Sequence, residues 1–260
     1  MEVALENLTV TDALPAVVVT LNRPERRNAL SMPLMIELRR TLEEQSGRAE
    51  VRAFVLRAEG RAFSAGHDLS ELTGRTLEDE QRIFRACSDL METIQRLPQP
   101  VVAAVQGVAT AAGCQLVATC DLALASESAT FATPGVKIGL FCSTPMVAVS
   151  RAIGRKRALY MLLSGRPIDA RTAAAWGLIN DVIPAGELDR AALEMATQIA
   201  AASPLTLAIG KRAFYEQIDV TQPEAYRLMS QTMAENAMAC DAQEGMSAFL
   251  EKREPTWTGR

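Results

Sequence analysis

The chain has 260 residues, of which 48% are hydrophobic, so it can bury one large core with or without an appendage. Its formal net charge of −4 provides no basic footprint of the kind that binds nucleic acid, and no nucleic-acid partner is expected. No apolar run reaches the ~18 residues that a membrane-spanning helix needs, so no membrane span is expected either.

The N-terminal residues and the cysteines bear on the compartment. The segment from Met1 to Glu6 carries two acids and no basic stretch, unlike a secretory signal or a basic transit peptide. The five cysteines are odd in number and show no CxxC spacing, which favours reduced thiols. We therefore expect a cytoplasmic protein. Because the chain has one histidine and no cysteine pair, we expect no metal site.

Strands and helices alternate through roughly the first half of the chain, which is typical of the α/β class. Short apolar runs predict the strands, and Ser31, with Pro33 in the first turn, is expected to cap the first helix. A longer helix is expected to stop before Pro98, because proline cannot continue a helix. The strands are predicted at 3–10, 16–21, 53–58, 101–105, 122–125 and 130–132, and the helices at 31–45, 76–97 and 111–119.

From Ser143 onward the pattern is mostly helical. Ser143 itself, with Pro145 close behind, is typical of a helix N-cap followed by proline. A break at Ser203 divides the chain into a predicted core at 1–202 and C-terminal helices at 203–260. The last segment carries methionines at helical spacing, and faces of this kind usually pack against a partner, so we expect it to form an oligomer interface.

Two loops built from small residues each follow a predicted strand. One runs from Ala62 to Leu69, and the other runs from Ala109 to Gly113 and opens a helix. The N–H groups at a helix start carry a partial positive charge. Two such loops can aim two N–H groups at one carbonyl oxygen. That arrangement is an oxyanion hole, in which each donor lowers a reaction barrier by about 3 kcal/mol.

The order of these motifs closely resembles the crotonase superfamily, also called the enoyl-CoA hydratase/isomerase family. The resemblance covers essentially the whole chain. It rests on Leu21-Asn22-Arg23-Pro24 with Asn28-Ala29-Leu30, Phe63-Ser64-Ala65-Gly66-His67-Asp68-Leu69, Val102-Ala103-Ala104-Val105-Gln106-Gly107, Ala112-Gly113-Cys114-Gln115, Cys120-Asp121, Trp176-Gly177-Leu178, and the segment from Gly245 to Arg253.

The resemblance implies a crotonase-like spiral of ββα turns followed by C-terminal helices that assemble a trimer or a hexamer. It implies an acyl-CoA thioester as partner, with coenzyme A as part of the substrate and no separate cofactor. The thioester oxygen would accept hydrogen bonds from the backbone N–H groups of His67 and Ala112. The residues implied to contact coenzyme A are Arg26, Arg27, Ser64 and Ala65, together with Phe249 and Lys252 of the same or a neighbouring subunit.

Two glutamates activate water in the hydratases of this family, and both are missing here. Gln115 and Gly135 stand at their positions. A glutamine amide cannot take up a proton at a useful pH, and glycine has no side chain, so the usual acid–base chemistry would be absent. One branch of the family lacks both glutamates in the same way, and the pattern around Gln115 and Gly135 resembles that branch.

These residues leave several functions open. The first is an enzyme, of the kind labelled enoyl-CoA hydratase or isomerase, that stabilises a thioester enolate without the two glutamates. Within that class, decarboxylation of a malonyl-type thioester needs enolate stabilisation and no base to begin. The second is a non-catalytic protein that binds or carries acyl-CoA. The third is a structural subunit of a mixed oligomer.

Side chains near the motifs have simpler roles than catalysis. For His67, the only histidine, the backbone N–H is favoured over the imidazole as the functional group. Cys114 and Cys142 are expected to be small buried thiols, because a reactive cysteine needs an activating base or cation. Asp68 is expected to cap a turn or a helix.

Overall fold

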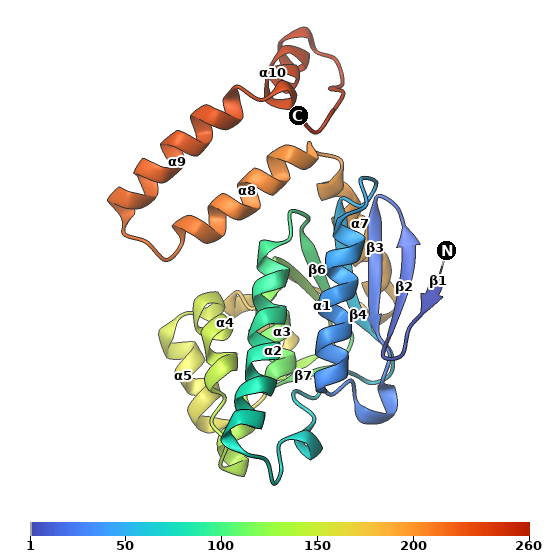
Figure 1. Ribbon diagram of the computed structural model, residues 1–260, viewed down its shortest axis with the longest axis vertical. Coiled ribbons are helices and arrows are strands. Elements are labelled where there is room, and N and C mark those ends of the chain that lie inside the picture. The colour runs from blue at the N-terminus through green and yellow to red at the C-terminus, as the bar shows by residue number, and fades with distance from the viewer. Residues whose placement is uncertain (1) are drawn as a thin grey trace.

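The computed structural model describes residues 2–260 and contains two sheets (Figure 1). The first strands of the larger sheet form an antiparallel meander, and from the third strand onward neighbours run parallel. The larger sheet has seven strands in the spatial order β1 (Glu2–Ala4), β2 (Leu8–Ala13), β3 (Ala16–Leu21), β4 (Ala53–Ala58), β6 (Val101–Val105), β8 (Leu122–Ser126) and β11 (Asp181–Ile183).

The smaller sheet has four strands, in the order β10 (Ile168–Asp169), β9 (Thr130–Ala132), β7 (Val108–Thr110) and β5 (Ala62–Ser64). Each of β4, β6 and β8 is followed by one strand of this smaller sheet and then by a helix. The three helices are α2 (Leu77–Arg96), α3 (Ala112–Thr119) and α4 (Ser143–Ile153). The successive ββα units confirm the predicted α/β spiral core.

Helices cover both faces of the larger sheet, which explains why its inner strands are mostly apolar. On one face, α1 (Met32–Ser46) and α2 enclose the main core. On the other face, α7 (Leu188–Ala200) packs a stripe of one leucine and three alanines against β4, β6 and β8. The spacing of that stripe is four residues, so its members share one side of the helix. They are Leu188, Ala192, Ala196 and Ala200.

The last three helices form an arm that stands off one end of the core (Figure 1). They are α8 (Pro204–Gln217), α9 (Gln222–Ala237) and α10 (Cys240–Glu251), and they follow α5 (Arg155–Ser164), α6 (Ala170–Trp176) and α7 in the chain. Within residues 2–260, α8 has one buried residue, Ala213, and α9 has none. The division at residue 203 falls between α7 and α8 and stays a prediction.

A buried ion pair fastens the arm to the core. The Nζ of Lys211 on α8 donates to Asp121 Oδ2 at 2.6 Å, and to two backbone carbonyl oxygens at and beyond the end of α2, each at 2.8 Å. Asp121 also accepts from the Val101 N–H at 2.7 Å and the Tyr215 hydroxyl at 2.9 Å. Burial raises the pKa of Asp121, and the Lys211 ammonium opposes that shift.

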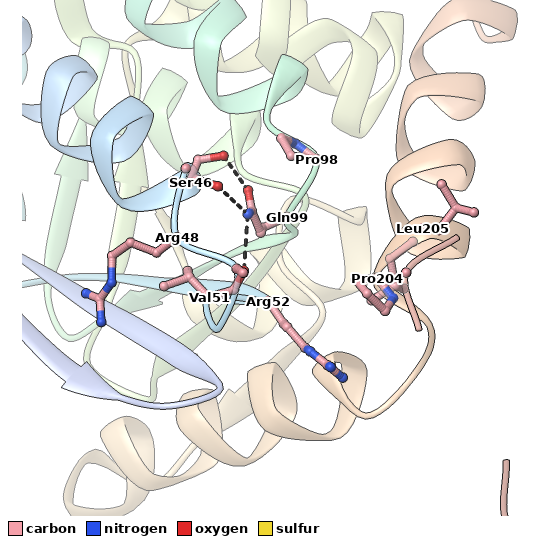
Figure 2. Close-up of a pocket in the computed structure, with 12 residues that line it drawn as sticks. Ser46, Arg48, Val51, Arg52, Pro98, Gln99, Pro204 and Leu205 are labelled. Atoms are coloured by element: carbon pink, nitrogen blue, oxygen red, sulfur yellow. Dashed lines mark hydrogen bonds between the residues drawn. The ribbon is translucent and has the colours of Figure 1, made fainter. Parts of the chain in front are cut away.

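A cavity of about 280 Å³ lies where the start of α8 approaches the core (Figure 2). The amide of Gln99 crosses it, accepting from the Ser46 hydroxyl at 2.7 Å and donating to the carbonyl oxygens of Ser46 and Val51 at 3.0 and 3.1 Å. Its lining includes none of the residues expected to contact acyl-CoA. We therefore assign it a structural role at this junction.

Most predicted elements are confirmed, and two details are wrong. Ser31 caps α1, accepting from the N–H of Leu34. The single strand predicted at 3–10 is two strands, β1 and β2, that pair antiparallel. Ser143 is not the cap of α4: Cys142 holds the N-cap position, and the Ser143 N–H turns back to the Phe141 carbonyl at 2.8 Å. The cause is the close packing of residues 140–142, described below.

Candidate active site

The two small-residue loops lie against each other at one edge of the smaller sheet. β5 and β7 are parallel neighbours, so both loops leave the sheet at the same end. A Cβ placed on Gly66, where φ is +87°, would lie 2.9 Å from Ala111 Cβ and 3.3 Å from Ala112 N. A Cβ on Gly113 would lie 2.3 Å from the Ser64 carbonyl oxygen. The two glycines therefore allow the loops to interlock.

The backbone N–H of His67 is turned away from its neighbouring strand. Leu30 donates its N–H to the Gly66 carbonyl at 2.7 Å and accepts from the Asp68 N–H at 3.3 Å. Successive residues of extended backbone face opposite ways, so the intervening His67 N–H points away from Leu30. Among residues 2–260 this N–H has no acceptor.

The backbone N–H of Ala112 is also without an acceptor in the described chain. Ala112 begins α3, and the first N–H groups of a helix have no intrahelical partner. The residue before it, Ala111, has a positive φ of 51° and donates its own N–H to Ala132 at 2.9 Å. Two unpaired N–H groups on interlocked loops, one of them at a positive helix end, can receive a single carbonyl oxygen.

The imidazole of His67 is packed against neighbouring side chains and makes no hydrogen bond within residues 2–260. It lies edge to face with Phe84 of α2, with ring centroids 5.3 Å apart. Both ring nitrogens are sealed from solvent and have no partner among residues 2–260. Burial lowers the pKa of His67, because desolvation disfavours the charged ring. The imidazole is therefore neutral at neutral pH.

Gln115, expected to stand at the position of the first glutamate, is 4% exposed on the first turn of α3. Its Oε1 accepts a hydrogen bond from Cys87 Sγ on α2 at 3.9 Å. Its Nε2 has no acceptor within residues 2–260 and is not sealed from solvent. No sequence motif points to Cys87, which precedes Gln115 by 28 residues and meets it only through the packing of α2 on α3.

Gly135, expected to stand at the position of the second glutamate, has no room for any side chain. A Cβ there would lie 1.9 Å from the Leu140 carbonyl oxygen and 2.9 Å from Cys142 Sγ. The loop is held in place from both sides: the Leu140 N–H donates to the Gly135 carbonyl at 3.0 Å, and the Gly135 N–H donates to Cys142 Sγ at 3.4 Å. The space beside Gly135 is therefore filled by the backbone of the chain itself.

We expect Gly135→Ala to lower the free energy of unfolding by about 1–3 kcal/mol, because the added methyl must displace the backbone at Leu140. Urea denaturation measures the difference. The matched control is Gly186→Ala, where nothing lies within 4 Å of the new methyl, and its effect should stay within about 0.5 kcal/mol. Equal effects at both positions would contradict the close packing of this loop.

The cysteines near the site are buried thiols with a raised pKa. Burial raises the pKa of Cys114 to about 12. Burial also raises the pKa of Cys142, against the opposing hydrogen bond from the Gly135 N–H. Both side chains are at most 6% exposed. A thiol that stays protonated at neutral pH is a poor nucleophile, so the geometry supports the expected role of small buried thiols.

The residues expected to contact coenzyme A fall into two groups. Arg26 and Arg27 are exposed on a turn, and the Arg27 carbonyl accepts from the Ala65 N–H at 3.0 Å, which brings this turn to the loop that contains Ser64. Asp68 caps the next turn, as expected, through the Ser70 N–H at 3.2 Å.

Phe249 and Lys252 form the second group. Phe249 lies on α10 and Lys252 directly follows that helix. α10 packs on α8 and α9, at the far end of the arm from α3 (Figure 1). Within one chain, therefore, the structure does not bring this pair to the donor loops.

The fold and the paired loops define a class of protein. The sequence model of a family described as enoyl-CoA hydratase/isomerase matches residues 15–260, and the chain belongs to this family. Among the similar proteins are several called enoyl-CoA hydratase domain-containing protein 3. The mitochondrial rat protein of that name is 46% identical over 92% of this chain and 80% of its own length.

Two solved structures are similarly close. One is enoyl-CoA hydratase from Mycobacterium smegmatis, with a TM-score of 0.94 and 46% identity over 97% of this chain and 99% of that chain. The other is human enoyl-CoA hydratase domain-containing protein 3, with a TM-score of 0.94 and 42% identity over 97% of this chain and all of that chain. Both structural similarities extend over the core and the arm of this chain.

The expected cytoplasmic location is contradicted by these comparisons. The related proteins from rat, Xenopus laevis and human are each named as mitochondrial. The acidic first residues were therefore a wrong guide to compartment. Among residues 2–260, no single helix has the length and apolar character of a membrane span, although the bent pair Ala185–Ala200 and Pro204–Gln217 meets those criteria jointly.

Proposed function

We propose that this protein binds an acyl-CoA thioester and stabilises negative charge on its carbonyl oxygen through the backbone N–H groups of His67 and Ala112. The observation that carries the proposal is that both N–H groups emerge from interlocked loops with no acceptor in the described chain. Such donors act mainly where charge develops, so they favour an enolate over the ground-state thioester. Coenzyme A enters as part of the substrate.

We propose further that the reaction does not proceed by glutamate-activated addition of water. Gln115 cannot accept a proton, and the Leu140 carbonyl fills the space beside Gly135. General acid–base catalysis typically contributes about 10²–10⁴-fold to a rate, and neither position supplies it. The neutral, sealed imidazole of His67 offers no replacement. The best-supported chemistry is therefore one that needs enolate stabilisation alone.

A second candidate is a non-catalytic acyl-CoA carrier. The filled space at Gly135 favours it, because a site without either acid could hold a thioester without converting it. The same N–H groups would then bind the ground-state carbonyl.

The test is a panel of crotonyl-CoA, a long-chain enoyl-CoA, methylmalonyl-CoA and saturated acyl-CoAs. Binding is followed by thermal shift and products by mass spectrometry. Turnover of any member supports the enzyme. Tight binding without a product supports the carrier. Absence of binding across the panel would refute both.

We propose that the arm mediates self-association and that Phe249 and Lys252 reach the coenzyme A of a neighbouring copy. The support is the apolar surface that the arm exposes, with Phe249 82%, Leu250 79% and Met238 78% exposed. Light scattering after gel filtration should give a mass three or six times the 28.1 kDa of the chain. Phe249→Glu with Leu250→Glu should lower that mass. A wild-type mass of 28.1 kDa would contradict the proposal.

A further inference from the structure

The amide of Gln115 has a defined orientation. Burial raises the pKa of Cys87 to about 12, so its thiol stays protonated at neutral pH and has a hydrogen to donate. That hydrogen goes to Gln115 Oε1. An amide that accepts on its oxygen side turns its NH₂ the other way. Gln115 Nε2 is thus a donor without an acceptor, on a side chain that is 4% exposed.

This donor lies close to the place proposed for the thioester oxygen. Gln115 is three residues after Ala112, and its N–H closes the first turn of α3 onto the Ala111 carbonyl at 3.0 Å. One helical turn rises about 5.4 Å, and residues three apart share a face. A thioester held at the Ala112 N–H carries C3 of its acyl chain two bonds from the carbonyl carbon. A group on C3 is therefore within range of the Gln115 side chain.

The charge near a group on C3 also differs from what the family resemblance implies, which is a pair of glutamates. Neither acid position carries a carboxylate, because Gln115 is neutral and Gly135 has no side chain. A pair of glutamates there would repel an anionic oxygen and would compete with a neutral one for hydrogen-bond donors. With an amide donor in their place, an oxygen on C3 gains a partner and meets no opposing charge from these positions.

We propose that Gln115 selects acyl-CoA thioesters that carry a hydrogen-bond-accepting oxygen on C3, either a carboxylate or a carbonyl, over thioesters whose C3 is hydrocarbon. The inference rests on the proposed binding of acyl-CoA at His67 and Ala112. It makes Gln115 a specificity-determining residue, and the hydrogen bond from Cys87 is what holds its donor outward.

Isothermal titration calorimetry of the full chain tests the proposal with malonyl-CoA, acetoacetyl-CoA and butyryl-CoA, with ligand integrity checked by mass spectrometry. The wild type should bind at least one of the first two about tenfold more tightly than butyryl-CoA, the worth of one buried hydrogen bond. Preference for malonyl-CoA alone identifies a carboxylate, and preference for acetoacetyl-CoA alone identifies a carbonyl. Equal binding of all three overturns the inference but leaves the proposed function standing. Failure of all three to bind overturns both.

Two variants whose side chains have nearly the volume of glutamine distinguish the effect of the amide group from the effect of side-chain size. Gln115→Met should bring the three affinities within about twofold of one another, because the donor is lost. Gln115→Glu should bind malonyl-CoA more weakly than butyryl-CoA, because like charges repel. The control is Gln198→Glu, which adds the same charge on the exposed side of α7 and should leave the wild-type order unchanged. Thermal melting checks that Gln115→Met is folded. If the folded variant keeps the wild-type preference, that result alone overturns the inference.

Discussion

Replacing Ala112 by proline is expected to lower the turnover of any acyl-CoA substrate by about 10²–10³-fold, the usual loss when one oxyanion donor is removed. Proline has no N–H, and Ala112 is the first residue of α3, where helices tolerate proline best. The change therefore deletes the proposed donor at the position least costly to the helix. Steady-state kinetics with whichever thioester is converted provides the measurement. If none is converted, the dissociation constant of a saturated thioester should rise instead.

The control for this prediction is Ala112→Gly, which keeps the N–H and removes only a methyl group. Its turnover should stay within several-fold of the wild type. Thermal melting of both variants establishes that they are folded, since Ala111 holds a positive φ that a following proline could disturb. A folded Ala112→Pro variant with wild-type turnover would remove this N–H from the mechanism.

Replacing Lys211 by methionine is expected to lower the free energy of unfolding by about 3–5 kcal/mol, because it leaves the Asp121 carboxylate buried without its cation. The side chains of this pair are 8% and 14% exposed, so solvent screens the remaining carboxylate only weakly. The surface variant Lys156→Met, at an exposed position, should change the same quantity by less than about 0.5 kcal/mol. Denaturant unfolding monitored by circular dichroism distinguishes the two.

The loss in Lys211→Met should depend on pH. Burial already raises the pKa of Asp121, and without Lys211 nothing of opposite charge restrains that shift. A carboxyl whose folded-state pKa lies above its unfolded value favours the folded state at low pH, and that benefit disappears as the pH rises through the folded-state pKa. The variant should therefore be less impaired near pH 4 than near pH 8. Combining it with Asp121→Asn should recover part of the stability at pH 8. A pH-independent loss with no recovery would contradict the buried ion pair.

The parts of the fold that follow local rules could be predicted from the sequence. β3, β4 and β6 begin and end where expected, because each is a short and mostly apolar run bounded by polar or proline residues. The cap at Ser31 follows from its own side chain. The cap predicted at Ser143 failed because a contact outside the helix, between residues 140–142 and Gly135, sets where α4 begins.

Some parts of the candidate site could likewise be predicted from the sequence, and others could not. The small residues around Gly66 and Gly113 mark the donor loops, since only such residues permit the observed approach. The contact of Cys87 with Gln115 joins separate helices, and that of Lys211 with Asp121 spans 90 positions. No periodicity or motif encodes such pairings, because they arise from how whole elements pack.

The Leu140 carbonyl beside Gly135 also limits how position 135 can vary. A single substitution that places a glutamate at 135 would bring its side chain against main chain and would cost stability. Such a change can be accommodated only together with a different path of residues 139–142. The close packing of this loop therefore makes substitution at position 135 depend on its neighbours, so that this position cannot vary independently of the loop that follows it.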